Sequence, residues 1–445
     1  MSEQVKAISY KKLFRFFFPL AATPIMIGLT HSIINAALAR LPFPEESIAV
    51  FTVVKGIVMI ISSPTLMSLQ LVVTYVDDRD SYKQIIRFTW AVGGILFSLL
   101  MLLAYTPLGE WIFRNMIGLT ADNQISFAYA ALRIACFLPL VQVLRNTHQG
   151  IAIAVRKTNF FVPGIVLRLI IISLFLWYAV RTRLVLGVVA GSLTWVTGIG
   201  IEGFFILGSL IYYFNNLDLA IEKMPKRNKD NPVLAEIVKF FIPLGLMISL
   251  GAFLQPIIQS GIARSNLATQ SLAAYGVAWG LIATISGPIG MLHQLSLIYT
   301  EGTGDINWKP VMNFSLLTGL VLLLIISVIA LSPLGNWLLI DVIGVSDEIA
   351  RIAQRVLLAF ALFPLIRSFR ESYWGLLMNR RTTSLIGIAK IVNIVVVAST
   401  IFFGILKLSV QPAVFGALAF TLGEGVESIL IWYYAVKYPE RNVSR

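Results

Sequence analysis

Long apolar runs separated by short polar loops follow one another along the whole chain. The hydrocarbon core of a bilayer is about 30 Å thick, so a helix needs about 20 apolar residues to cross it. The runs are long enough and carry few charges. They predict twelve membrane-spanning helices, over residues 14–39, 48–76, 86–105, 125–153, 160–180, 184–214, 236–263, 270–299, 310–332, 348–377, 384–406 and 412–436.

Proline occurs inside several of these runs, where a soluble helix would break. In a membrane bundle, neighbouring helices can satisfy the carbonyl groups that proline leaves without a donor. The prolines therefore predict kinks within spans and not the ends of spans. They are Pro19, Pro24, Pro64, Pro139, Pro243, Pro256, Pro288 and Pro364.

The composition supports a membrane protein, because 57% of the 445 residues are hydrophobic and only 13% are charged. Soluble domains contain about 45–50% apolar and about 25% charged residues. The net charge of +13 does not indicate a nucleic-acid partner, because the basic residues form short clusters between the apolar runs. More Lys and Arg lie in loops on the side of the two termini, which predicts cytoplasmic termini in a multi-pass protein of the inner or plasma membrane.

The chain also repeats itself. Separations of 224 to 226 residues pair similar positions throughout, among them Asn35 with Gln259, Pro64 with Pro288, Gln70 with Gln294, Trp111 with Trp337, Arg145 with Arg370 and Glu202 with Glu427. The repeat predicts a six-helix half at 1–214, a cytoplasmic linker at 215–232 and a second six-helix half at 233–445. An even number of spans gives both halves one orientation, and parallel repeats of this kind are typical of transporters that work by alternating access.

Charged residues inside the spans need a partner or a function, because a charge in hydrocarbon is costly. The cations are Lys55, Arg133, Arg145, Arg168, Arg367, Arg370 and Lys390, and the acids are Glu202, Glu371, Glu424 and Glu427. We expect structural ion pairs between Arg168 and Glu202, between Lys390 and Glu424 or Glu427, and between Arg367 and Glu371. Arg133 lies near the end of its span, where its head group can reach the interface.

Lys55, Arg145 and Arg370 remain without a predicted partner, and all three are positive. In one interpretation the two arginines reach the headgroup layer beside the cytoplasmic loops. In the other they form a positively charged vestibule between the halves, because the guanidinium fork suits carboxylate and phosphate groups. His148 follows Arg145 by one helical turn and can add a donor to the same site.

Other polar side chains in the spans have two interpretations. The repeat mates Asn35 and Gln259, and likewise Gln70 and Gln294, either join helices by hydrogen bonds or line a cavity. Glu202 and Glu427 are expected to organise the C-terminal ends of the two halves.

Motifs of other chemistry are missing from the sequence. It has no phosphate-binding lysine loop, no HExxH motif and no Ser-His-Asp constellation, and its single cysteine is Cys136. We therefore expect no enzyme activity, no cofactor and no metal.

The plan of six plus six spans resembles the multidrug and toxin extrusion (MATE) and oligosaccharide-flippase superfamily. Within it the chain is similar to the progressive ankylosis proteins. The matching residues are the run Leu339-Ile340-Asp341-Val342-Ile343-Gly344-Val345, the turn Thr147-His148-Gln149-Gly150, Arg370 with Gly375, and Asn35, Pro64, Pro243, Pro256, Arg264 and Glu427.

The resemblance implies a MATE-like, all-α integral membrane protein with twelve transmembrane helices as two parallel six-helix repeats. Animal members are implicated in the export of polyanions such as ATP, pyrophosphate and citrate. Cation-coupled MATE exporters carry an acidic residue on the first span, whereas residues 14–39 of this chain contain none. The resemblance therefore implies anion export.

We predict a secondary active transporter, acting as a monomer, that exports an organic or phosphate-bearing anion. Arg145, Arg370, Lys55 and His148 are the predicted substrate contacts. The cavity-lining or coupling candidates are Asn35, Gln259, Gln70, Gln294, Glu202, Glu427, Arg168 and Lys390. The expected partners are the anion, a coupling ion and membrane lipids. The alternatives are a flippase for a lipid-linked anionic headgroup and cation-coupled multidrug efflux, for which Glu424 and Glu427 are the acidic pair.

Overall fold

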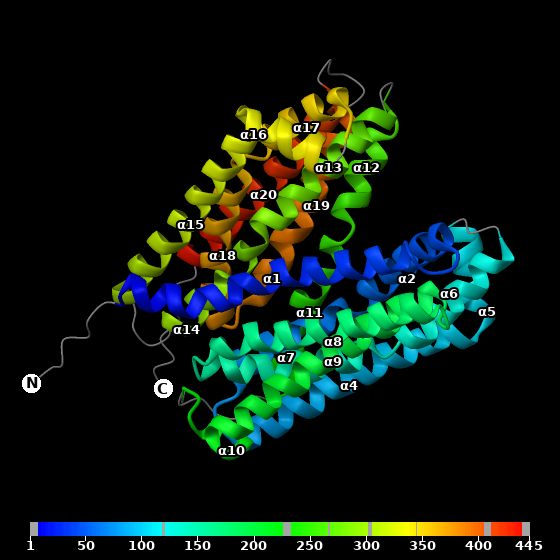
Figure 1. The fold of residues 1–445 in the computed structure, drawn as a ribbon. Coiled ribbons are helices and arrows are strands. Elements are labelled where there is room, and N and C mark those ends of the chain that lie inside the picture. Colours follow the sequence, from blue (N-terminus) through cyan, green and yellow to red (C-terminus); the bar gives the residue numbers. More distant parts are fainter. Residues whose placement is uncertain are drawn as a thin grey trace, which may run out of the picture. The chain divides into compact units, whose positions relative to one another are not determined.

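The structure is a computed structural model that describes residues 8–117, 121–225, 233–265, 268–300, 305–343, 345–404 and 411–437. Every regular element in these ranges is a helix (Figure 1). Twelve segments are long and apolar enough to cross a membrane: Tyr10–Leu38, Glu46–Tyr75, Arg79–Tyr105, Asp122–Ala154, Thr158–Thr182, Gly187–Phe214, Leu234–Ile262, Gln270–Tyr299, Ile306–Leu331, Asp347–Asn379, Thr383–Gly404 and Pro412–Lys437. The prediction of an all-α protein with twelve spans is confirmed.

Several spans contain a break and therefore consist of more than one helix. The elements are α1 (Tyr10–Leu38), α2 (Pro44–Ser62), η1 (Ser63–Met67), α3 (Ser68–Tyr75), α4 (Arg79–Tyr105), α5 (Pro107–Trp111), η2 (Ile112–Ile117), α6 (Asp122–Ala135), α7 (Leu138–Ala154), η3 (Thr158–Phe160), α8 (Phe161–Thr182), α9 (Gly187–Phe214), α10 (Leu217–Glu222), α11 (Leu234–Gly251), α12 (Leu254–Ile262), α13 (Ala268–Ser286), η4 (Gly287–Met291), α14 (His293–Tyr299), α15 (Asp305–Leu331), α16 (Pro333–Asn336), η5 (Trp337–Ile343), α17 (Asp347–Ala359), α18 (Phe363–Asn379), α19 (Thr383–Gly404) and α20 (Pro412–Lys437).

The breaks recur at matching places in the two halves. The second and eighth spans each contain one turn of 3₁₀-helix, η1 and η4, that begins beside Pro64 or Pro288. Proline lacks an N–H group and clashes with the preceding turn, which favours such a local change of helix type. The fourth and tenth spans break where α7 and α18 begin, and Pro139 and Pro364 stand in the first turns of those helices.

Short helices that were not predicted also recur. α5 leads into the π-helical turn η2, and α16 leads into the π-helical turn η5. The common order of elements supports the internal repeat. Gly344, in the run that resembles the progressive ankylosis proteins, lies outside the described residues, and so do residues 226–232 of the predicted linker. The first part of that linker contains α10.

Packing divides the chain into two compact units. The N-terminal unit is Met26–Phe241, and the C-terminal unit combines Met1–Ile25 with Ile242–Arg445. The division by packing and the division by repeat differ, because α1 and α11 each run from one unit into the other. Aromatic contacts fix the starts of these helices: Phe16 lies 5.3 Å from the Tyr299 ring, and Phe241 lies 5.2 Å from the Phe88 ring.

Glycines bring together the helices that carry the buried charges. In the N-terminal unit, α7, α8 and α9 lie side by side (Figure 1). A Cβ atom at Gly203 of α9 would lie 3.2 Å from the backbone nitrogen of Arg145 on α7. In the C-terminal unit, a Cβ atom at Gly423 of α20 would lie 2.8 Å from Oδ1 of Asn393 on α19. Helices in membranes approach closely where residues are small.

Candidate functional site

The first charge cluster lies inside the N-terminal unit around Glu202 of α9, whose side chain is fully buried. Nη1 of Arg168 donates to this carboxylate at 2.6 Å, and Nε2 of Gln149 donates to its other oxygen at 2.9 Å. Nη2 of Arg168 also donates to the Thr30 hydroxyl at 2.5 Å. The predicted pair of Arg168 with Glu202 is confirmed, and it joins α1, α7, α8 and α9.

Arg145 lies beside the same carboxylate, so the prediction that it has no partner is wrong. Its Nε and Nη2 atoms donate to Oδ1 of Asn146 at 3.1 and 3.0 Å. Its Nη1 atom lies 3.9 Å from Oε2 of Glu202, which is an ion pair without a hydrogen bond. The Asn146 amide in turn donates to the Thr65 carbonyl at 3.0 Å. Arg145 is only 8% exposed, so its guanidinium is enclosed and does not extend into a headgroup layer.

Lys55 and His148 complete the predicted cationic set of this unit. Lys55 on α2 is half-buried, and it has no ion pair or hydrogen bond with any residue in the described ranges. His148 is buried on α7, and its Nδ1 atom lies 2.6 Å from the carbonyl of Leu144, one turn earlier. That nitrogen is therefore engaged within the helix.

The spans of the N-terminal unit carry more positive than negative charge. Away from the ends of these spans, four cations (Lys55, Arg133, Arg145 and Arg168) stand against the single carboxylate of Glu202. Arg133 is set apart from the others, because its guanidinium carbon lies 5.1 Å from the centre of the Tyr105 ring. Arg145 and Arg168 lie at Glu202, and Lys55 adds a third cation to the interior of the same unit.

The second cluster lies in the C-terminal unit and is balanced. Nη1 of Arg370 donates to Glu424 at 2.6 Å and lies 3.2 Å from Glu427, and Nη2 donates to Glu371 at 2.7 Å. Nζ of Lys390 donates to Glu427 at 2.6 Å and to Glu424 at 3.4 Å. The predicted pairing of Lys390 with these two glutamates is confirmed. The prediction that Arg370 lacks a partner is wrong.

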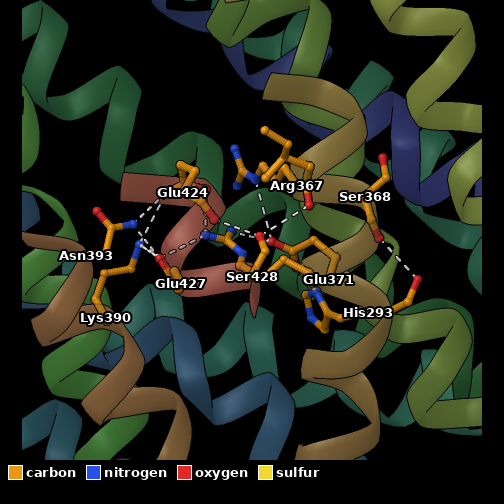
Figure 2. A network of polar contacts seen from close by, with 12 residues as sticks. His293, Arg367, Ser368, Glu371, Lys390, Asn393, Glu424, Glu427 and Ser428 are labelled. Atoms are coloured by element: carbon orange, nitrogen blue, oxygen red, sulfur yellow. Dashed lines mark hydrogen bonds and ion pairs between the residues drawn. The ribbon is translucent and has the colours of Figure 1, made fainter. Parts of the chain in front are cut away.

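Figure 2 shows how further side chains extend this network on both sides. Nδ2 of Asn393 donates to Glu427 at 2.5 Å and to Glu424 at 3.1 Å. On the opposite side, Nε of Arg367 donates to Glu371 at 3.5 Å, and this predicted pair is confirmed. Nδ1 of His293 lies 3.0 Å from the second oxygen of Glu371. Three cations and three carboxylates therefore neutralise one another across α18, α19 and α20.

The link between Arg370 and Glu371 is absent from the sequence prediction for a physical reason. Neighbouring residues on a helix point in different directions, so the spacing did not suggest a pair. The long arginine side chain bends back to its neighbour while it also reaches α20. His293 was also missed as a partner of Glu371, because only the fold brings α14 against α18.

The internal repeat shows which residues the two clusters have in common. Arg145 and Glu202 are the repeat mates of Arg370 and Glu427, and both pairs make an ion pair. The other members differ at an offset of 224 or 225: Leu69 corresponds to His293, Asn146 to Glu371, Ile165 to Lys390, Arg168 to Asn393 and Ile199 to Glu424. One arginine–glutamate pair is thus common to both halves, and the surrounding charges are particular to each.

The predicted amides fall into two groups by burial. Asn35 on α1 and Gln259 on α12 are exposed in their units, whereas Gln70 and Gln294 are buried. Gln294 contacts the imidazole of its neighbour His293 at 3.0 Å. Among the described residues, no three or more His, Cys, Asp and Glu side chains are grouped so that they can hold a metal ion.

The chain matches one protein family in sequence and several solved structures in fold. Residues 1–271 and 236–436 match the model of one family, described as Progressive ankylosis protein (ANKH). A MOP superfamily transporter from Pyrococcus furiosus is similar in structure, with a TM-score of 0.71, 15% identity and coverage of 97% of this chain and 98% of that one. That protein is described as having a binding pocket of reverse polarity that suggests a different function.

MATE transporters give similar matches. A mutant of the Vibrio cholerae transporter VcmN superposes with a TM-score of 0.73 at 14% identity, covering 97% of both chains. A multidrug resistance MATE transporter in an outward-facing conformation superposes with a TM-score of 0.68 at 15% identity, covering 97% of this chain and 98% of that one. At these identities the similarity is one of fold.

Proposed function

We propose that this chain, which belongs to the progressive ankylosis protein (ANKH) family, is a secondary transporter that exports an organic or phosphate-bearing anion. The chain is a multi-pass membrane protein with the fold of MATE transporters. The proposal places it in the cell membrane as a monomer with both termini in the cytoplasm.

The observation that carries the proposal is the unbalanced positive charge in the spans of the N-terminal unit. Away from the span ends, Glu202 is the one acid among the described residues of that unit, and Arg168 already holds it at 2.6 Å. Arg145 and Lys55 therefore keep most of their charge uncompensated. Such charge within a membrane-spanning region is costly unless a counter-charge is near, and a bound anion supplies one.

Arg145 is the principal substrate contact in this proposal. Asn146 holds its Nε and Nη2 atoms, and the Nη1 atom has only the long contact of 3.9 Å to Glu202. A carboxylate or phosphate oxygen that reaches Nη1 would gain a short, charge-assisted hydrogen bond. Lys55 adds a second cation in the same unit, and Asn146 fixes the plane of the guanidinium in advance.

Arg370 takes a different role from its repeat mate. Glu371, Glu424 and Glu427 already surround it, so an added anion would meet three carboxylates. We assign Arg370 to holding α18 against α20, with Lys390 and Asn393 fastening α19 to the same carboxylates. The balanced network is therefore a framework, and the cationic surplus on the other unit supplies the affinity.

Cation-coupled drug efflux is the alternative that the fold also supports, because known MATE multidrug transporters share it. The acidic pair that efflux would use, Glu424 with Glu427, is already in contact with Arg370 and Lys390. The first span, α1, contains no acid. The Pyrococcus furiosus protein, with its reverse pocket polarity, shows that a similar fold can carry an altered charge pattern.

A ligand screen on the purified protein separates these functions. Thermal shifts would be measured with nucleotides, pyrophosphate, citrate, cationic dyes and polyprenyl phosphates. Stabilisation by the soluble anions, weakened by added salt, is the expected result. Stabilisation by the dyes alone would replace the proposal with drug efflux. Stabilisation by polyprenyl phosphates alone would replace it with a flippase.

A further inference from the structure

We propose that His293 and Gln294 form a proton-binding site that couples transport to a proton gradient, with H⁺ as the coupling ion. The inference rests on the proposed secondary transport and names its driving ion. It comes from the hydrogen bonds of α14, which begins directly after the kink of the eighth span. Figure 2 shows His293 of this helix beside Glu371 of α18.

The contacts of His293 define one neutral form of its imidazole. Nδ1 lies 3.0 Å from a carboxylate oxygen of Glu371, so Nδ1 carries a hydrogen and donates it. Nε2 lies 3.0 Å from Nε2 of Gln294, an amide nitrogen that can only donate. The second imidazole nitrogen therefore accepts, and the ring is neutral in this arrangement.

Gln294 can support a second form. Its Oε1 atom is buried and has no hydrogen-bond partner among the described residues, although buried polar atoms are nearly always paired. When a proton binds to Nε2 of His293, rotation of the amide by half a turn brings Oε1 to accept it. The same two side chains thus satisfy both the neutral and the protonated imidazole, with one proton taken from water and none released.

Protonation changes the charge of the cluster. Arg367, Arg370 and Lys390 are balanced by three carboxylates while the imidazole is neutral, so the bound proton leaves a net charge of +1. From α18, Glu371 faces the ring directly, and Arg367 and Arg370 act on it through that carboxylate. The 3₁₀ turn η4 carries no charged residue, and α15 carries two, Asp305 and Lys309, both in its first two turns.

The position of this pair favours coupling over a purely structural contact. α14 begins directly after η4, and a 3₁₀ turn inside a helix often marks a hinge. α14 also meets α18 at Gly375, where a Cβ atom would lie 2.3 Å from the His293 carbonyl oxygen. A charge that appears at so close a helix contact would change the packing of the kinked span. The repeat mate of His293 is Leu69, so only the second half contains this histidine–glutamine pair.

A titration of tryptophan fluorescence tests proton binding without any substrate. The Trp374 ring lies 4.8 Å from the His293 ring, and a protonated imidazole quenches indole fluorescence more than a neutral one. The difference between wild type and Trp374→Phe is expected to show one transition when the pH is varied. His293→Gln should abolish this transition, and His31→Gln should retain it. A transition that survives in His293→Gln, or none in the wild type, would overturn the proton site.

Transport in proteoliposomes tests the coupling. Wild-type protein should accumulate pyrophosphate about tenfold for each unit of pH difference if one proton is coupled to each anion. His293→Gln should still exchange labelled for unlabelled pyrophosphate but lose this accumulation, whereas His31→Gln should keep it. Accumulation by His293→Gln would contradict the coupling. Failure of every variant and the wild type to exchange pyrophosphate would refute the proposed function, with the fluorescence result unaffected.

Gln294→Glu provides a second variant if His293→Gln does not fold. A carboxylate accepts hydrogen bonds but does not donate them, so it supports only the protonated imidazole. The fluorescence transition should therefore occur at a different pH from that of the wild type. A transition at the wild-type pH would show that Gln294 takes no part, and the proposed site would be wrong.

Discussion

At the scale of single residues, each buried carboxylate of the two clusters contacts two cations. The pairs Arg168 with Glu202 and Arg367 with Glu371 were predicted from neighbouring spans or helical spacing, and the structure contains both. Arg370 was misjudged because its partners come from its own neighbour and from α20 at once. Which carboxylate a long side chain reaches depends on helix rotation, and hydropathy does not specify rotation.

The Glu202 cluster yields the first prediction. Glu202→Gln removes the only carboxylate between Arg145 and Arg168 and leaves two buried cations facing each other. We expect a loss of about 3–5 kcal/mol in the free energy of unfolding, as for other broken buried pairs. Thermal unfolding in detergent measures it. The double variant Arg168→Leu/Glu202→Leu removes both charges and should be less destabilised, and a double variant as unstable as Glu202→Gln would contradict the pairing.

At the scale of elements, the number and type of helices followed from hydropathy, and the irregularities did not. An apolar run reports length and burial, so all twelve spans were predicted. The 3₁₀ turns η1 and η4 were expected only as kinks near Pro64 and Pro288. The π-helical turns η2 and η5 were missed, because nothing in their composition differs from an amphipathic surface helix. The close approach of α7 to α9 depends on Gly203, whose role is visible only when both helices are placed.

That approach yields a second prediction. In Gly203→Leu the new side chain meets the backbone of Arg145, where even a Cβ atom would be 3.2 Å away. Overpacking of this kind costs about 1–3 kcal/mol, and it would also displace Arg145 from Glu202. Gly208→Leu on the same helix is the matched control, because nothing lies within 4 Å of a Cβ atom there. Equal melting temperatures of the two variants would refute the proposed contact.

At the scale of the whole molecule, duplication explains the shared elements and divergence explains the proposed function. Both halves keep one arginine–glutamate ion pair, Arg145 with Glu202 and Arg370 with Glu427. The first half then keeps a cationic surplus, and the second compensates its cations and adds His293. The repeat was readable from the sequence, because its register holds over both halves. The sequence did not reveal that the second half neutralises its buried cations whereas the first does not. Neutralisation depends on contacts between helices that only the fold defines.

The most direct test of the account is equilibrium binding of labelled pyrophosphate to purified wild type, Arg145→Ala, Arg145→Lys and Arg133→Ala. Loss of a charge-assisted contact worth about 1.5–3 kcal/mol should weaken binding about tenfold or more in Arg145→Ala. Lysine should restore little, because it lacks the guanidinium fork. Arg133, which lies over the Tyr105 ring away from the cluster, is the matched control and should bind as the wild type does. Unchanged affinity in well-folded Arg145→Ala, or no pyrophosphate binding by the wild type, would contradict the central claim.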